Sequence, residues 1–186
     1  MRAKSRVQNL QCLQAGGIDL HDTIYFENGL SLVPVTGENV LVFIIQVKKL
    51  AEYEKLLDIV EMNEDLVKKV FLTEGTNVKG YVAYYEGKPV GFTIYFYNFS
   101  SFKCRKGLYL EDLYIDPEYR GKGFGKTILK HLAAVAVSEG CGRFEWAVLD
   151  WNTPAINFYK SLGAVPMDEW TIFRVEGEAL RKLAEQ

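Results

Sequence analysis

The sequence is poor in the residues that build disulfide frameworks, metal centres and nucleophilic triads. It contains three cysteines and two histidines among 186 residues. The number of cysteines is odd and no C-x-x-C pair occurs, which argues against a disulfide framework and a zinc site. Two histidines are also too few for a histidine-rich metal site. We therefore expect reduced thiols, no bound metal and a cytoplasmic location.

Long apolar runs and an excess of positive charge are lacking as well. The longest apolar run, residues 40–47, is far shorter than the roughly 18 residues of a membrane span. No apolar segment of a secretory signal follows the basic start of the chain. The formal net charge is -2, so the composition carries no basic footprint for nucleic acid. We expect a globular protein that binds neither membranes nor nucleic acid.

What the chain does contain is one stretch, residues 108–127, in which a strand pattern, a basic glycine-rich turn and a helix pattern follow one another. Glycines let main-chain N–H groups approach a ligand closely. A helix N-terminus adds unpaired N–H donors and a partial positive charge. The order therefore predicts a phosphate or pyrophosphate site. Its basic and small residues are Arg120, Gly121, Lys122, Gly123, Gly125 and Lys126.

The spacing of this turn selects among phosphate-binding motifs. A P-loop would need glycine where the chain has Arg120, and a dinucleotide fingerprint would need glycine at Lys126 or Ile128. The pattern R-x-x-G-x-G, from Arg120 to Gly125, fits instead. It resembles the acetyl-CoA-binding motif of the GNAT family of N-acetyltransferases. On the hexapeptide alone, an ordinary glycine-rich strand–helix turn is an equal alternative.

Two adjacent carboxylates, Glu111 and Asp112, lie inside the apolar strand pattern. Neighbouring side chains on a strand point to opposite faces unless the strand bulges. A bulge here would splay the strand from the next apolar segment, residues 144–149, and open a slot. The alternative is that both carboxylates are solvated at the end of a sheet.

A second motif follows at residues 151–164, N-x-x-A-x-x-F-Y-x-x-x-G, in which Asn152, Ala155 and Tyr159 take part. It is also similar to a GNAT motif. With the L-Y-L-E-D and A-E-Y-E-K segments, it makes the region from Lys48 to the C-terminus resemble the diamine (spermidine/spermine) acetyltransferases and their bacterial relatives.

The resemblance implies an acetyl-CoA-dependent N-acetyltransferase that transfers the acetyl group directly to a small primary amine, most closely a polyamine or diamine, and that forms a homodimer. An amino-acid-like amine, a peptide amine and a non-catalytic CoA-binding module are the alternatives. It implies that Tyr159 protonates the leaving thiolate and that Glu111 is the base, through water, or only binds the cation. The expected acetyl-CoA contacts are Leu113, Tyr114, Ile115, Arg120, Gly121, Lys122, Gly123, Phe124, Gly125, Lys126, Asn152, Ala155 and Tyr159. The expected amine contacts are Tyr53, Glu54, Glu111, Asp168, Glu169 and Trp170.

The predicted fold is α/β, with a mixed, mostly antiparallel sheet whose central strands are splayed and flanked by helices. The domain is expected to span residues 30–186, after an N-terminal extension of residues 1–29. Strands are predicted over residues 30–35, 78–85, 90–99, 108–115, 144–149 and 170–175. Helices are predicted over residues 40–51, 62–71, 124–138, 155–162 and 178–185.

Overall fold

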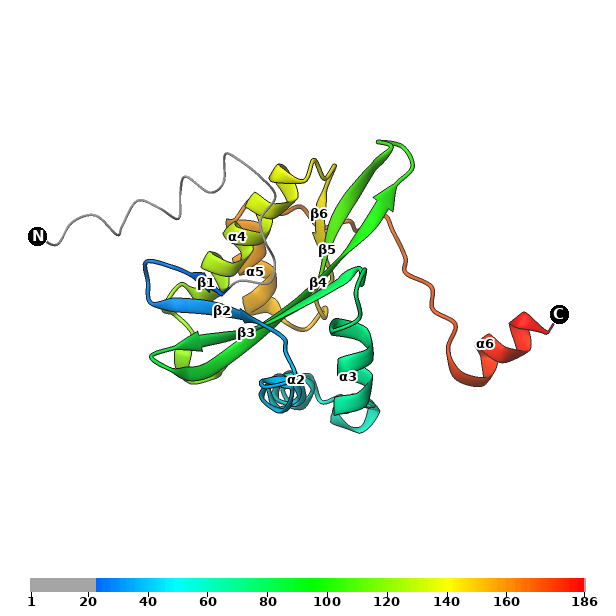
Figure 1. Cartoon of the computed structure of the whole chain (residues 1–186). Coiled ribbons are helices and arrows are strands. Elements are labelled where there is room, and N and C mark those ends of the chain that lie inside the picture. The colour runs from blue at the N-terminus through cyan, green and yellow to red at the C-terminus, as the bar shows by residue number, and fades with distance from the viewer. Residues whose placement is uncertain (1–22, 186) are drawn as a thin grey trace, which may run out of the picture. The chain divides into compact units, whose positions relative to one another are not determined.

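A computed structural model describes residues 23–185 of the chain, which form two units divided between Ala147 and Val148. The first unit contains a six-stranded sheet (Figure 1). Its strands are β1 (Ile24–Tyr25), β2 (Leu30–Pro34), β3 (Val78–Tyr85), β4 (Lys88–Ser100), β5 (Arg105–Ile115) and β6 (Phe144–Trp146). Its helices are α2 (Val40–Glu54), α3 (Glu64–Phe71) and α4 (Phe124–Ser138), with 3-10 turns η2 (Leu57–Ile59) and η3 (Pro117–Tyr119). The second unit contains α5 (Thr153–Ser161) and α6 (Gly177–Ala184).

The sheet is mixed and mostly antiparallel, as predicted. Its strands follow one another in sequence order from β1 to β6, each pair antiparallel except β5 and β6, which are parallel. The hairpin between β3 and β4 turns through Glu86 and Gly87, both with positive φ, 50° and 74°. This is the two-residue turn that matches the twist of antiparallel strands.

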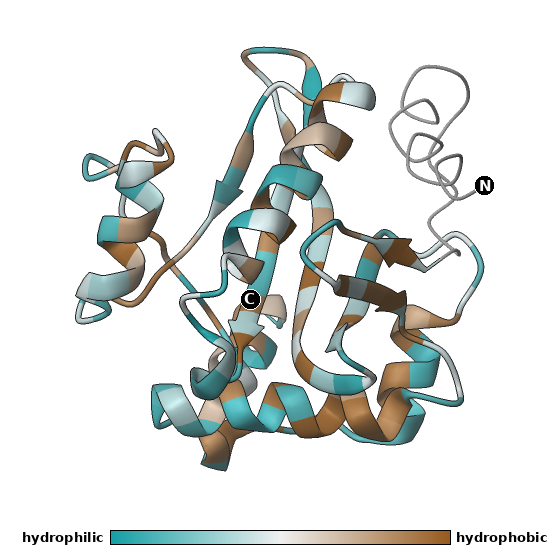
Figure 2. Ribbon diagram, turned by 90° about the vertical axis from the view of Figure 1, so that its left-hand side faces the viewer, coloured by the Kyte–Doolittle hydropathy of each residue, from teal (hydrophilic) through white to brown (hydrophobic). Residues whose placement is uncertain are grey.

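Each face of the sheet is covered by helices. On one face, a buried cluster joins α2 and α3 to the sheet, and it contains Val40, Phe43, Ile44, Val67, Val82, Phe92, Ile94 and Tyr114. On the other face, the ring of Phe124 at the start of α4 lies 5.0 Å from that of Tyr85. In Figure 2 both the strands and the helices carry hydrophobic segments interleaved with paler and hydrophilic ones. Packing of helices on both faces of a sheet buries such hydrophobic segments.

Two predicted strands need correction. The strand expected over residues 144–149 ends at Trp146, because its partner β5 leaves the shared register after Leu110. The segment expected as a strand over residues 170–175 has no regular secondary structure. A strand needs a neighbour for its main-chain hydrogen bonds, and the described residues of the second unit contain no strand.

The sheet begins before the expected boundary at residue 30. Ile24 and Tyr25, placed by sequence in the extension, form the edge strand β1 against Leu32 and Ser31. The rest of that extension, residues 1–22, lies outside the described residues. Among the residues that are described, no helix is long and apolar enough to cross a bilayer, and no group of three or more potential ligands is placed to hold a metal ion.

Candidate active site

Strand β5 carries a β-bulge at Glu111. On β4, Ile94 pairs with Asp112 and the next residue, Tyr95, pairs with Leu110, so Glu111 is an extra residue in the ladder. Because side chains alternate along a strand, one extra residue reverses the face of those that follow. Asp112 therefore points to the same face as Ile94, the face covered by α2. This is the bulge that the adjacent carboxylates predicted.

The parallel pairing of β5 with β6 stops just before this bulge. It joins residues 108–110 to residues 144–146, and no residue of β5 beyond Leu110 pairs with β6 in the described chain. The two strands therefore separate at the bulge. The predicted splay of the central strands is confirmed.

Main-chain groups of β5 beyond the bulge face this unpaired edge. The N–H of Asp116 donates to the carbonyl of Val90, at 2.8 Å, on the opposite side. Since N–H and C=O groups alternate between the two edges of a strand, those of Leu113 and Ile115 point toward the open edge. The geometry suits an extended chain that binds as an added strand, as the resemblance implies for the pantetheine arm.

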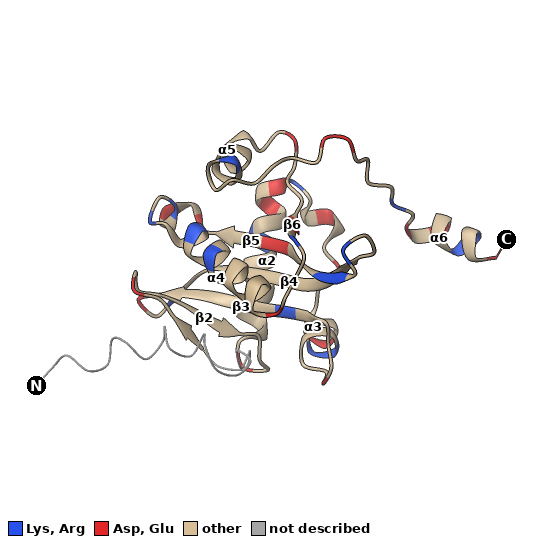
Figure 3. Ribbon diagram, turned by 90° about the horizontal axis from the view of Figure 1, so that it is seen from above, with Lys and Arg blue, Asp and Glu red and all other residues tan. Residues whose placement is uncertain are grey.

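Two carboxylates, Glu111 and Glu54 at the end of α2, act on a third, Asp112, beside the bulge. Burial, followed by the negative charges of Glu111 and Glu54, raises the pKa of Asp112 to about 7. Burial also raises the pKa of Glu54. Because like charges disfavour ionisation of their neighbours, a bound cation would stabilise the ionised form of Asp112. The cluster suits an ammonium group, and Figure 3 shows acidic residues on β5.

Asp112 was not among the predicted site residues, although the burial and charge of this cluster act most strongly on it. The signal was present in the sequence, because an ionisable side chain inside an apolar strand is costly unless it is partnered. What the sequence did not reveal was which of the two carboxylates is half-buried. Glu111 is exposed and Asp112 is not.

Helix α4 begins at a glycine in the left-handed region. Gly123 is its N-cap, with φ 81°, and supplies no side-chain cap; Gly121 has φ 78°. An added Cβ on either glycine would meet nothing within 4 Å, so backbone conformation rather than crowding requires them. The first N–H groups of α4, on Phe124, Gly125 and Lys126, have no acceptor inside the helix. Donors, glycines and open space together fit a pyrophosphate.

Two basic residues of the turn stack on different pairs of tyrosines. The guanidinium carbon of Arg120 lies 4.8 Å from the centroid of the Tyr53 ring and 5.7 Å from that of Tyr114. Its Nε donates to the carbonyl of Ile115 at 2.9 Å. These contacts place the Arg120 side chain beside α2 as well as beside the turn. Tyr53, an expected amine contact, is half-buried there next to Glu54.

Lys122 reaches the other side of the turn. Its Nζ lies 4.9 Å from the ring centroid of Tyr85 and 5.3 Å from that of Tyr119. Two further residues of the predicted site, Tyr114 and Phe124, have buried side chains. Only their main-chain groups can therefore contact a ligand.

The second unit holds the remaining predicted residues. Asn152 is the N-cap of α5, and its Oδ1 accepts a hydrogen bond from the N–H of Ala155 at 3.3 Å. Tyr159 follows one turn later, with its ring centroid 5.5 Å from that of Phe158. The expected amine contacts Asp168, Glu169 and Trp170 are exposed. The second motif is therefore a capped helix that presents Tyr159.

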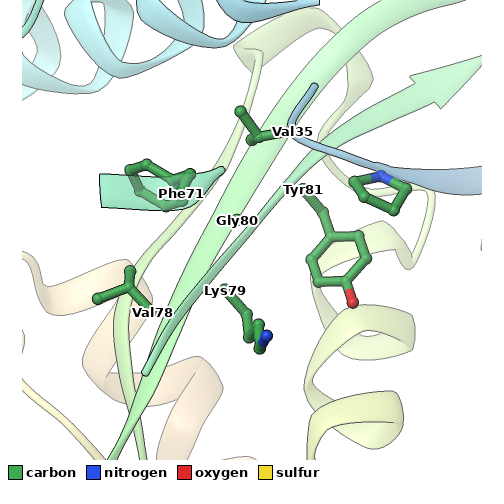
Figure 4. Close-up of a pocket in the computed structure, with 7 residues that line it drawn as sticks. Val35, Phe71, Val78, Lys79, Gly80 and Tyr81 are labelled. Carbon is green, nitrogen blue, oxygen red and sulfur yellow. The ribbon is translucent and has the colours of Figure 1, made fainter. Parts of the chain in front are cut away.

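One hollow of the first unit lies elsewhere. It is lined by Pro34, Val35, Phe71, Val78, Lys79, Gly80 and Tyr81. Figure 4 shows the aromatic ring of Phe71 beside Gly80, where an added Cβ would meet that ring at 2.7 Å. None of the predicted site residues borders this hollow, and we assign no function to it.

The fold thus combines a mixed sheet whose parallel strands splay with a glycine-rich turn before α4. Residues 49–164 match the model described as the acetyltransferase (GNAT) family. The chain belongs to this family, as predicted. It is therefore an acetyltransferase, and the cosubstrate of the family is acetyl-CoA.

Related proteins have names that refer to small amines. A thialysine N-epsilon-acetyltransferase from Bos taurus is 42% identical over 149 residues, covering 74% of this chain and 87% of the relative. An L-ornithine N5-acetyltransferase from Arabidopsis thaliana is 46% identical over 93 residues, covering 50% of this chain and 41% of the relative. The human spermidine/spermine N(1)-acetyltransferase-like protein 1 is 34% identical over 151 residues, covering 74% and 21%.

Solved structures agree on the fold. An integron cassette protein from V. cholerae superposes with a TM-score of 0.71 and 31% identity, covering 85% of this chain and 99% of the other. An aminoglycoside acetyltransferase from a soil metagenome gives a TM-score of 0.67 at 17% identity, covering 81% and 97%. The second likeness concerns the fold alone.

Proposed function

We propose that this protein acetylates the terminal primary amine of a small aliphatic cation, with acetyl-CoA as donor, and that a lysine-like amine such as thialysine is the first substrate to test. The observation that carries the proposal is the end of β5. There a strand edge without a partner, an acidic cluster and an uncapped helix N-terminus lie within one short stretch of chain.

Main-chain groups would bind the cosubstrate. The first N–H groups of α4 and the turn from Arg120 to Gly123 would bind the pyrophosphate, with Lys126 adding charge. The N–H and C=O groups of Leu113 and the N–H of Ile115 would hold the pantetheine arm. The carbonyl of Ile115 already accepts the Arg120 Nε, so its N–H is the group we assign to the arm. When bound, acetyl-CoA supplies an activated acyl group.

The amine site would be the acidic cluster. Glu54, Glu111 and Asp112 would attract the ammonium, and Tyr53 would cover the methylene chain. A carboxylate with a pKa of about 7 is a far better proton acceptor at neutral pH than an ordinary one. We therefore assign the base to Asp112, directly or through water, with Glu111 holding the cation.

Tyr159 would act as the general acid. This assignment rests on the second motif, because a tyrosine hydroxyl is a hydrogen-bond donor that can protonate a leaving thiolate. We expect Tyr159→Phe to lower kcat by about a hundredfold or more with little change in the KM for acetyl-CoA. Phe158→Leu, on the same helix turn, is the matched control. Unaltered turnover of Tyr159→Phe would remove this residue from the mechanism.

A diamine or polyamine is the second candidate. The three carboxylates favour it, because a substrate with two ammonium groups could satisfy more than one of them. The names and higher identity of the thialysine-acetylating relatives favour the lysine-like amine. The two share a primary ammonium at the end of a methylene chain.

The deciding experiment measures thiol release from acetyl-CoA against a panel of amines: thialysine, L-ornithine, L-lysine, putrescine and spermidine. We expect the highest kcat/KM for thialysine, and Asp112→Asn should lower it for every amine in the panel. A panel in which spermidine or putrescine is best would establish the second candidate. If CoA and acetyl-CoA do not bind at millimolar concentration, the proposed function fails.

A further inference from the structure

Two cationic side chains connect the turn before α4 to different neighbouring residues. Arg120 stacks on Tyr53 and Tyr114, whereas Lys122 stacks on Tyr85 and Tyr119. The partners of Lys122 belong to β3 and to the turn itself. Arg120 alone among these cations reaches α2.

The partners of Arg120 come from three parts of the candidate active site. Tyr53 belongs to the last turn of α2, next to the carboxylate of Glu54. Tyr114 belongs to the open half of β5. The Nε of Arg120 donates to the Ile115 carbonyl at 2.9 Å, on the edge assigned to the pantetheine arm. One side chain therefore joins the phosphate turn, the arm-binding edge and the wall of the amine site.

This contact requires arginine rather than any cation. A planar guanidinium can lie on an aromatic ring and still donate a directed hydrogen bond in its own plane. A second link between the same elements is the ion pair of Lys49 Nζ and Asp116 Oδ2, at 2.7 Å, in which the Asp116 side chain is 9% exposed. That pair fixes α2 against the start of the turn. It leaves Arg120 as the link to the end of α2, where the amine-site residues lie.

We propose that Arg120 is a positioning residue that couples the two substrate sites, so that filling one raises the affinity of the other. The proposal rests on the proposed function. A pyrophosphate bound by the main chain of the turn fixes the Arg120 backbone and, through the guanidinium, the ring of Tyr53. An amine held by Glu54, with its methylene chain covered by Tyr53 as proposed above, would fix the same ring. By linkage, the factor is the same whichever substrate binds first.

The coupling is measured by titrating CoA into the protein with and without saturating thialysine in a calorimeter. CoA carries no acetyl group, so no reaction intervenes. We expect the Kd of CoA to fall about fivefold when thialysine is present, at the lower end of ordinary couplings. In Arg120→Met the ratio of the two Kd values should be close to one. Arg120→Lys should restore part of it, since the charge returns without the directed hydrogen bond.

Two further variants separate coupling from general damage. Lys122→Met removes the other cation of the turn. We expect it to weaken CoA binding but to keep the wild-type ratio of the two Kd values. Tyr53→Leu removes the ring on which Arg120 stacks. The ratio of the two Kd values should then be close to one, as in Arg120→Met. A wild-type ratio of one, or a ratio that survives Arg120→Met, overturns the proposal. Because both ligands would still bind and react in that case, this failure is distinct from failure of the proposed function, in which CoA or amine binding is lost altogether.

Discussion

The two halves of β5 perform different tasks within one strand. Before the bulge, residues 108–110 pair with β4 on one side and with β6 on the other. After it, residues 112–115 pair only with β4 within the described residues. Leu108 and Leu110 in the first half are buried, whereas Asp112 and Leu113 in the second half are partly accessible. The first half stabilises the sheet, and the second keeps one edge of main-chain groups available to a ligand.

The difference shows how a strand can be both core and binding surface. An extra residue costs little in pairing with β4, which resumes at Asp112. It reverses the faces of the following side chains and ends the pairing with β6. A single insertion thus positions a carboxylate and opens an edge together. The bulge itself therefore matters more than the side chain of the bulged residue.

Deleting Glu111 should have the largest effect on activity. Without the extra residue, Asp112 and Tyr114 would keep their pairing with Ile94 and Phe92 in an unbroken ladder, and β6 could pair with β5 past Leu110 and close the open edge. We expect acetyl transfer to fall by about a hundredfold or more, while the unfolding free energy changes by less than about 1.5 kcal/mol, measured by thiol release and urea denaturation. Glu111→Ala, which keeps the bulge, is the control. Wild-type turnover in the deletion variant would contradict the role given to the bulge.

Truncation of one leucine in each half should separate stability from binding. Leu108 is fully buried, so Leu108→Ala should lower the unfolding free energy by about 2–4 kcal/mol. Leu113 is only half-buried, so Leu113→Ala should cost less than about 1.5 kcal/mol. The main-chain groups of Leu113 face the open edge and are kept in Leu113→Ala. The KM of this variant for acetyl-CoA should therefore change little. Equal losses of stability in the two variants would show that the halves do not differ.

Much of the fold followed from local pattern. The apolar patterns typical of strands located β3, β4 and β5, and the apolar pattern typical of a helix located α4. The glycine-rich turn indicated where α4 begins. In the structure, Asn63 and Asn152 are the N-caps of α3 and α5, and their side-chain oxygens accept hydrogen bonds from the N–H groups of Leu66 and Ala155, each three residues away. Signals that rest on neighbours within a few residues are therefore recoverable from sequence.

Features that depend on distant partners were harder to predict. The segment over residues 170–175 has strand composition, yet the described residues of its unit provide no partner strand. The surroundings of His131 on α4 include Phe26, a residue of the expected extension, whose ring centroid lies 5.7 Å from that of His131, and burial lowers the pKa of His131. The choice between Glu111 and Asp112 likewise depended on burial, which adjacency in sequence cannot specify.

The pH dependence of catalysis should identify which carboxylate acts. Burial raises the pKa of Asp112 to about 7, so kcat/KM for thialysine should rise as the pH passes through about 7 and Asp112 loses its proton. Asp112→Asn should remove this rise and lower kcat/KM at pH 8 by about a hundredfold or more. Glu111→Gln should lower the value but keep the rise. A rise that persists in Asp112→Asn would return the role of base to Glu111.

The smallest expected effect is on the free energy of unfolding. Raising the pH should lower the stability of the protein although it raises the activity. The pKa of Asp112 is raised in the folded state, so between about pH 4 and pH 7 the folded protein binds more protons than the unfolded chain. Asp112 therefore makes the protein less stable as the pH rises through this window, and its cost is constant above it.

Asp112→Asn should remove this cost while keeping the shape of the side chain. One pKa unit corresponds to about 1.4 kcal/mol, and solvent near a half-buried carboxylate screens part of the shift. We expect the variant to equal the wild type at pH 4 and to exceed it by about 1–2 kcal/mol at pH 8, measured by urea denaturation at both values. A saturating amine cation should narrow the gap by stabilising the wild-type carboxylate. A variant less stable than the wild type at pH 8 would mean that protein groups, rather than a substrate, already neutralise Asp112.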